Sequence, residues 1–291
     1  MLKKNEFEDW ISASHKLYDI FEQRYDAYPL ALKWVQQWQS FSKFIIDAKD
    51  MDTVERLLQE FDCNAFRNIN DRYERDNAYW NKLSSEITAK FGSFVSRNLK
   101  IGEANDIGKA ISLYLITWNF QRFKEYFKYD RQFDLDAYFS QLGTFLPTKS
   151  QKLKSFQAKN LISNSVDQSA VRQVFNEINL KLKQIGKEQN EPVGTAKILH
   201  IFAPAYFPLI DNSEAQAIGL VSYGQTLTVD HYISWMTQLK NWLLNYADII
   251  EKLEKQHNYT IVRLVDEGLY LMSSVKQKAR VAELGINSGE Q

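Results

Sequence analysis

The sequence is almost without cysteine: Cys63 is the single one among 291 residues. An intramolecular disulfide is therefore excluded, and so is a metal site built from several cysteines. The four histidines are widely separated, and no two lie at the His-x-x-x-His spacing of a helical metal site. The Gly-x-x-x-x-Gly-Lys-Ser/Thr and Gly-x-Gly-x-x-Gly motifs that hold nucleotide phosphates do not occur. We therefore expect no bound metal and no cofactor.

The chain also lacks an excess of charge of either sign and a long apolar run. Thirty-six Lys and Arg balance thirty-six Asp and Glu, so no global field attracts nucleic acid or an anionic membrane. Positive charge gathers only at residues 148–190, where eight basic and three acidic side chains leave a net charge of +5. The apolar-rich run 110–120 is too short to cross a bilayer, and the first residues form no apolar signal segment. Together with the single cysteine, these features predict a cytoplasmic protein with no membrane partner.

Proline and glycine are scarce as well. Five prolines and eleven glycines leave few places where a helix must end. Apolar residues recur at spacings of three and four along most of the chain, and 14% of the residues are aromatic, which indicates helices around a packed core. Asp134 is the expected N-cap of one helix, and Gly143 is its expected end. Helices are expected over roughly residues 5–26, 30–48, 53–61, 71–98, 106–128, 134–143, 149–161, 167–186, 193–203, 212–219, 229–255 and 259–280.

These helices predict an all-α protein with two lobes. The long, charged helix over residues 71–98 suits an element that bridges two lobes, and the polar residues 101–105 mark the expected boundary. We expect one helical lobe over residues 1–100 and a second over residues 101–291.

The segment 191–219 carries the most suggestive order of residues. Val193-Gly194-Thr195-Ala196-Lys197 begins an apolar helix, and a proline-led apolar approach then leads to Asp211 at the start of another helix. This order resembles the core of the helix-hairpin-helix DNA glycosylase superfamily. In that family a hairpin lays backbone N–H groups against a DNA phosphate, and an aspartate near the start of a later helix stabilises the cationic sugar as a flipped base departs.

The resemblance implies that Val193, Gly194 and Thr195 hold a phosphate of duplex DNA and that Asp211 is the catalytic carboxylate. Lyase-type members carry a Schiff-base lysine directly before the Thr-Ala pair, where this chain has none. Lys197 and Lys187 are the lysines nearest to that position. Because the position itself has no lysine, the implied reaction uses water as the nucleophile. The alternative is structural, because Asp211-Asn212-Ser213-Glu214 has the pattern of a capping box.

A second stretch, 113–124, joins an apolar helix to a basic and aromatic end. Trp118 and Arg122 lie one turn apart, so the guanidinium can approach the indole. With Lys124 they could contact a phosphate backbone while an aromatic ring stacks on a base. The alternative is that Trp118 belongs to the core and that Arg122 pairs with a carboxylate such as Glu125 or Asp211.

Two functions are therefore open at the level of the sequence. The first is a DNA-binding protein of glycosylase type that cleaves the N-glycosidic bond of a damaged base. The second is a non-catalytic, all-helical scaffold that binds a protein partner, in which the same residues are caps and core. His200, on the helix after Gly194, is expected to be a hydrogen-bonded core histidine in either case.

Overall fold

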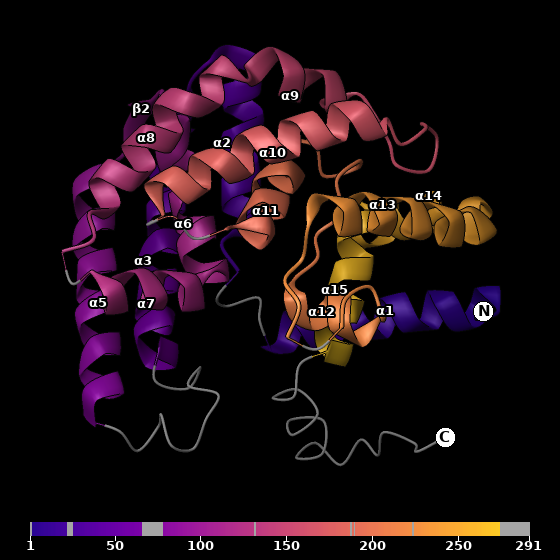
Figure 1. Cartoon of the computed structure of the whole chain (residues 1–291), viewed down its shortest axis with the longest axis horizontal. Helices are drawn as coiled ribbons and strands as arrows, with labels where there is room; N and C mark the ends of the chain where they lie inside the picture. The colour runs from indigo at the N-terminus through magenta and orange to yellow at the C-terminus, as the bar shows by residue number, and fades with distance from the viewer. Residues whose placement is uncertain are drawn as a thin grey trace. The chain divides into compact units, whose positions relative to one another are not determined.

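The computed structural model describes residues 2–21, 26–65, 78–130, 132–186, 188, 190–222 and 224–273 (Figure 1). Helices make up almost all of the regular structure in these ranges, and the two strands found there have three residues each. The all-α class predicted from the sequence is confirmed. None of the described helices combines the length and the apolar composition needed to cross a membrane.

The chain forms two compact units, and each is assembled from separated segments. Unit 1 contains residues 1–21, 155–177 and 195–291, and unit 2 contains residues 22–154 and 178–194. The boundary expected at residues 101–105 therefore falls within unit 2. Three helices have residues in both units: α9 (Ser150–Gln157), α10 (Gln168–Ile185) and α11 (Pro192–Phe202).

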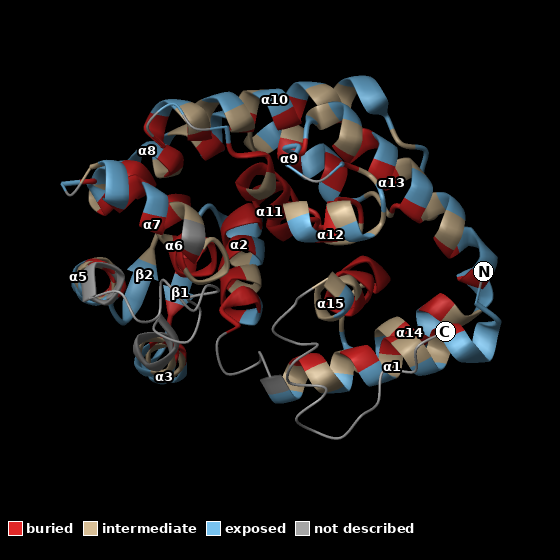
Figure 2. Ribbon diagram, turned by 60° about the horizontal axis from the view of Figure 1, so that its bottom comes forward, coloured by how far each residue is buried: buried red, intermediate tan, exposed pale blue. Residues whose placement is uncertain are grey.

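Unit 2 is built around the apolar helix α6 (Ile107–Trp118), which Figure 2 shows mostly in the colour of buried residues. Asp106 caps this helix by accepting a hydrogen bond from the Gly108 amide at 2.9 Å. Phe91 and Phe94 from α5 contribute further buried rings. The other described elements of unit 2 are α2 (Tyr28–Phe41), β1 (Phe44–Ile46), α3 (Ala48–Ala65), α5 (Ala78–Asn98), β2 (Gly102–Ala104), α7 (Phe120–Tyr129) and α8 (Leu135–Thr148).

Gly143 does not end α8, contrary to the prediction from the sequence. Asp134 caps the helix as expected, but the helix continues through Gly143 to Thr148. Gly143 packs closely against Asp106, because a Cβ atom at this position would lie 1.9 Å from the Asp106 carboxylate. On the facing helix, a Cβ at Gly108 would lie 2.0 Å from the Phe139 carbonyl oxygen. The two glycines therefore allow α6 and α8 to approach each other closely.

The helix predicted over residues 30–48 is too long. α2 ends at Phe41, Ser42 takes a left-handed conformation, and residues 44–46 form β1 instead. β1 pairs with β2 in an antiparallel two-stranded sheet, with Ile45 opposite Glu103. Phe44 and Ile46 point into the core, whereas Ile45 is exposed. A strand of three residues has too short a hydrophobic pattern to be distinguished in the sequence from the end of a helix.

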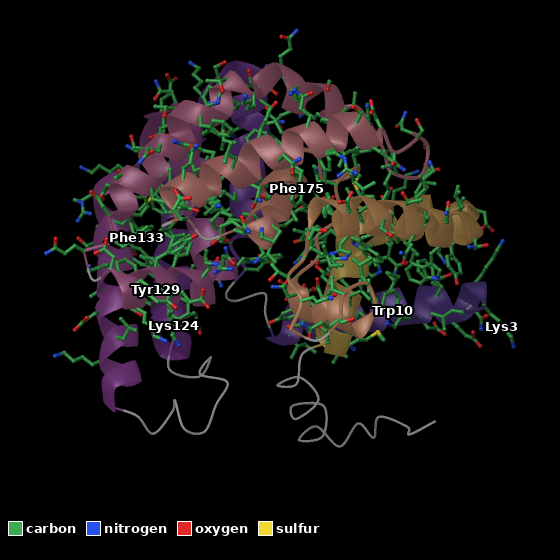
Figure 3. All side chains as sticks on the ribbon, viewed as in Figure 1. Lys3, Trp10, Lys124, Tyr129, Phe133 and Phe175 are labelled. Carbon is green, nitrogen blue, oxygen red and sulfur yellow. The ribbon has the colours of Figure 1, made fainter. Side chains whose placement is uncertain are left out.

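Unit 1 is built around α15 (Ile261–Ser273), whose residues from Ile261 to Gly268 are all buried. Gly268 lies against the Trp10 ring of α1 (Lys4–Phe21), where a Cβ atom would be 2.2 Å from the indole (Figure 3). His200 is fully buried as predicted, and its Nδ1 lies 2.7 Å from the Phe207 carbonyl oxygen. Burial lowers the pKa of His200 to about 3. The remaining elements of unit 1 are α12 (Asn212–Ala217), α13 (Val229–Leu243), a 3-10 turn (Leu244–Tyr246) and α14 (Ala247–His257).

Candidate functional site

The residues predicted to hold a phosphate do not form a hairpin turn. Val193, Gly194 and Thr195 belong to the beginning of α11, and Gly194 is not among the described glycines with positive φ. Thr195 is fully buried, and its hydroxyl has no hydrogen-bond partner among the described residues. The Thr195 side chain therefore cannot reach a DNA phosphate at the surface.

A carboxylate of the chain itself lies at the start of α11. Glu191, directly before Pro192, is only 2% exposed. Its Oε1 atom lies 2.7 Å from Arg122 Nε and accepts a hydrogen bond from the Tyr126 hydroxyl. A Cβ atom on Gly194 would approach Glu191 Oε2 to 3.4 Å, so the small residue leaves room for the carboxylate. A negative group here suits the partial positive charge of a helix N-terminus, which an external phosphate would otherwise use.

Glu191 ties several elements of unit 2 together. Its backbone amide donates to Asn179 Oδ1 on α10 at 2.9 Å, while its side chain faces Arg122 and Tyr126 on α7. Burial raises the pKa of the Glu191 carboxyl to about 7, although the Arg122 guanidinium acts to lower it. Glu191 was not among the site residues predicted from the sequence. Its only local signal was a glutamate immediately before a proline that begins a helix.

Arg122 is consequently engaged with protein carboxylates. Besides Glu191, it contacts Glu125, with Nη1 and Oε2 2.7 Å apart. The pairing with Glu125 is the structural alternative recognised in the sequence. Trp118 donates from Nε1 to Asp26 Oδ1 at 3.0 Å and stacks on Tyr28 with ring centroids 6.0 Å apart.

Lys124 was predicted to contact DNA, and its burial argues against that role. Lys124 is only 4% exposed, and Figure 3 marks it on α7 within unit 2. A buried ammonium cannot neutralise phosphates on a docked duplex. Lys187, the other lysine predicted to contact DNA, lies outside the described residues.

In unit 1, Asp211 and Glu214 form the capping box that their spacing predicts. The Asp211 carboxylate accepts from the Glu214 amide at 2.7 Å, and the Asp211 amide donates to Glu214 Oε2 at 2.7 Å. Glu214 is buried, whereas Asp211 retains partial exposure. The structural interpretation of Asp211 as part of a capping box is therefore correct, and the residue is partly exposed.

Lys197 and Asp211, the two predicted catalytic residues, act on the same pair of buried carboxyl groups. Burial raises the pKa of Glu214 well above its usual value, Asp211 and Asp266 raise it further, and Lys197 opposes them. Burial also raises the pKa of Asp266, with Asp211 adding to the rise and Lys197 opposing it. Lys197 is itself 9% exposed. We call Lys197, Asp211, Glu214 and Asp266 the carboxyl cluster.

The carboxyl cluster continues into a buried ion-pair network along α15. Arg263 Nη1 lies 2.5 Å from Asp266 Oδ2, and Arg263 Nε lies 3.3 Å from Glu267 Oε1. Glu267 Oε2 lies 2.7 Å from His15 Nδ1 on α1. The hydrogen bond to Glu267 raises the pKa of His15 above its usual value. Buried ions stay charged only when such partners surround them, which accounts for the density of pairs.

Among the acidic members of the carboxyl cluster, Asp211 alone is outside the buried class. It is therefore the acidic residue of the cluster that has partial exposure to solvent. Within the described ranges no group of three or more His, Cys, Asp or Glu side chains has the arrangement of a metal site. No family model, curated protein or solved structure matches the chain. The chemistry of the site has to be inferred from its own residues.

Proposed function

We propose that this protein binds duplex DNA and cleaves the N-glycosidic bond of a flipped, damaged base, with Asp211 as the carboxylate that stabilises the cationic sugar. The observation that carries the proposal is the carboxyl cluster. Lys197 from α11 and Asp211 from the turn before α12 act on the same buried Glu214 and Asp266. The resemblance to helix-hairpin-helix glycosylases implies that Asp211 is the catalytic carboxylate, and Lys197 is one of the two lysines nearest to the position where lyase-type members carry their nucleophile.

The position of Asp211 suits stabilisation of a positive charge. In the proposed reaction the base leaves with the electron pair of the glycosidic bond, and the sugar becomes an oxocarbenium ion. A carboxylate held beside C1′ lowers the energy of that ion through electrostatic attraction. The Glu214 amide fixes the Asp211 carboxylate by a 2.7 Å hydrogen bond, so the group is oriented before substrate arrives.

Water is the proposed nucleophile. Its oxygen bonds to C1′, and its proton is transferred to the departing base or to solvent. Lyase-type members carry their Schiff-base lysine directly before the Thr-Ala pair, where this chain has Gly194. Lys197 then serves to offset the negative charge of the cluster, and the reaction is monofunctional.

DNA has to be held elsewhere than at the start of α11, because Glu191 occupies that end of the helix. The proposal therefore requires contacts between DNA phosphates and basic side chains other than those at the start of α11. Such contacts predict binding that weakens steeply as the salt concentration rises.

Replacement of Asp211 tests the proposal. Asn caps a helix about as well as Asp, so Asp211→Asn is expected to change the free energy of unfolding by less than about 0.5 kcal/mol while it removes the negative charge. We expect loss of base release from a panel of damaged-base duplexes, by at least about a hundredfold, with DNA binding retained. Asp134→Asn, at the equivalent N-cap of α8, is the matched control and should leave release unchanged.

Unaltered base release by Asp211→Asn, or no binding to duplex DNA even at low salt, would contradict the proposal. Those results favour the second function, a non-catalytic scaffold for a protein partner. The capping box at Asp211 and the burial of Thr195 and Lys124 support that alternative. In a scaffold, Asp211→Ala should only lower the free energy of unfolding, by about 1 kcal/mol, through loss of the cap.

A further inference from the structure

A chain of charged groups runs through the interior of unit 1 from α1 to α12. It begins at His15 on α1, whose Nδ1 lies 2.7 Å from Glu267 Oε2. Arg263 joins Glu267 to Asp266, with Nε 3.3 Å from Glu267 Oε1 and Nη1 2.5 Å from Asp266 Oδ2. α15, which carries these three residues, packs against α12, which carries Glu214 (Figure 1). The two ends of the chain are therefore linked by charged groups in contact.

The buried part of this chain has more acidic than basic groups. Among the described residues of unit 1, the buried charged side chains are Glu214, Asp266 and Glu267 against Lys197 and Arg263. If all five were ionised, one negative charge would lack a buried counter-charge. An uncompensated charge away from water is strongly unfavourable, and a buried carboxyl avoids it by binding a proton. The balance of buried charge therefore calls for one proton on a carboxyl group.

Glu214 is the carboxyl that the contacts select for this proton. Asp266 and Glu267 each pair with Arg263, whereas Glu214 Oε2 accepts from the backbone amide of Asp211. A neutral carboxylic acid can accept that hydrogen bond as well as a carboxylate can. Burial raises the pKa of Glu214 well above its usual value, and Asp211 and Asp266 raise it further. With Glu214 neutral, the buried acidic and basic groups balance.

The other end of the chain can exchange protons with solvent, because His15 is only partly buried. The hydrogen bond to Glu267 raises the pKa of His15, and burial and Arg263 act against that rise. Asp19 on the same helix lies 3.5 Å from His15 Nε2, measured to Oδ2, and also favours the charged ring. A protonated His15 therefore adds one positive charge to the chain.

A second histidine faces His15 from α14. The ring of His257 lies against that of His15 with centroids 4.7 Å apart, and the Tyr259 ring lies 5.5 Å from His15. His257 Nε2 is 3.3 Å from Ser12 Oγ. Burial and the charge of His15 lower the pKa of His257. As the pH falls, His15 is thus the first of the two histidines to become charged.

We propose that Glu214 is a protonated, neutral carboxylic acid at neutral pH, and that the charge of His15 controls how firmly Glu214 holds its proton. A positive charge on His15 makes the interior more favourable for an ionised Glu214, and loss of that charge makes it less favourable. The network then transmits the pH at the surface of α1 to the side chain that binds the Asp211 amide. This coupling does not depend on the proposed reaction.

The proton on Glu214 can be observed by infrared spectroscopy of the full chain, because a protonated carboxyl and a carboxylate absorb at different frequencies. At pH 7 exposed Asp and Glu side chains are ionised, so we expect a protonated-carboxyl band that arises from the interior. Glu214→Gln should remove this band. Glu191→Gln identifies any contribution from Glu191 in unit 2, whose pKa burial raises to about 7.

Isotope labelling makes the same assignment without relying on the stability of Glu214→Gln. Carbon-13 in the glutamate side chains should shift the frequency of the band in the otherwise native protein. Carbon-13 in the aspartate side chains should leave it in place. A shift with labelled aspartate alone would place the proton on a residue such as Asp266 and overturn the proposal.

Two substitutions at opposite ends of the chain test the control by His15. His15→Gln removes a positive charge and should raise the pH at which the band is half lost by at least about 0.5. Asp211→Asn removes a negative charge, keeps the cap and should lower that pH by at least about 0.5. His231→Gln on α13 is the control and should change it by less than about 0.1. Thermal unfolding confirms that each variant is folded.

The outcomes separate this coupling from the proposed reaction. The absence of a protonated-carboxyl band assigned to Glu214, or an equal midpoint in native protein and His15→Gln, would overturn the coupling. Base release is not measured in these experiments. Failure of the reaction at Asp211 therefore leaves the coupling intact, and failure of the coupling leaves the reaction open.

Discussion

At the scale of single residues, the chain is distinguished by carboxylates that are buried against partners. Glu191, Glu214, Asp266 and Glu267 are all buried, and each has a cation or an amide beside it. Removing water from a carboxylate is unfavourable by several kcal/mol, and only good partners offset that loss. Loss of the cation from a buried ion pair should therefore destabilise the fold more than loss of the cation from an exposed pair.

Removal of Arg122 should therefore be far more damaging than removal of an exposed arginine. Arg122→Ala leaves the Glu191 carboxylate buried with its cation missing, and we expect unfolding to become easier by about 3 kcal/mol. The matched control is Arg97→Ala, because the side chains of Arg97 and Asp136 are 57% and 44% exposed. That control should cost less than about 1 kcal/mol in urea unfolding. Equal effects of the two substitutions would show that the Glu191 pair is not a structural element of unit 2.

The pair of His15 and Glu267 should make stability depend on pH. The pKa of His15 is raised in the folded protein, so the folded state binds the proton more tightly than the unfolded chain does. The stabilisation is then fully present below about pH 6.5 and is lost as the pH rises through the folded pKa. We expect His15→Gln to remove this loss from urea unfolding measured between pH 5.5 and 8.5. His231→Gln on α13 is the control, and an identical pH profile for His15→Gln and native protein would refute the assignment.

At the scale of elements, glycine has two opposite roles in these helices. Gly92 on α5 has nothing within 4 Å of the position where a Cβ atom would stand. Gly108 on α6 has the Phe139 carbonyl oxygen of α8 at 2.0 Å from that position. Helix propensity alone would rank alanine above glycine at both places. Packing between helices reverses the order at one of them.

We accordingly predict opposite signs for the same substitution. Gly92→Ala should raise the free energy of unfolding by about 0.5–1 kcal/mol, because it reduces the freedom of the unfolded chain. Gly108→Ala should lower it by about 1–3 kcal/mol, because α6 and α8 must move apart. Chemical unfolding of the two variants beside the native protein decides the matter. A stabilised Gly108→Ala variant would mean that the close approach of α6 and α8 is not required.

The caps show which element boundaries are local in origin. Asp134 and Asp211 were identified as caps from the sequence, and both accept the hydrogen bonds expected of them. Gly143 was expected to end a helix and instead lies within one. A cap is decided by three or four consecutive residues, whereas a glycine in close contact is decided by a neighbouring helix.

At the scale of the whole molecule, each unit draws on segments far apart in the chain. Unit 1 joins residues 1–21 to residues 195–291, and the His15–Glu267 pair spans that separation. A boundary placed from local polarity at 101–105 carries no information on such pairing. Which distant helices pack together depends on which of their apolar faces meet. Most of the helices have similar apolar faces, so the sequence pattern does not identify the partners.

The sequence by itself determined that this protein is helical, that Asp134 and Asp211 begin helices, and that His200 is buried. These properties follow from periodicity and from short patterns, which act within a few residues. Only the tertiary structure decided that Glu191 occupies the start of α11, that Lys124 and Thr195 are buried, and that Lys197 and Asp211 share the buried carboxyls Glu214 and Asp266. Burial of a charge and its partners depends on helices that meet across long stretches of chain, so no local pattern records it.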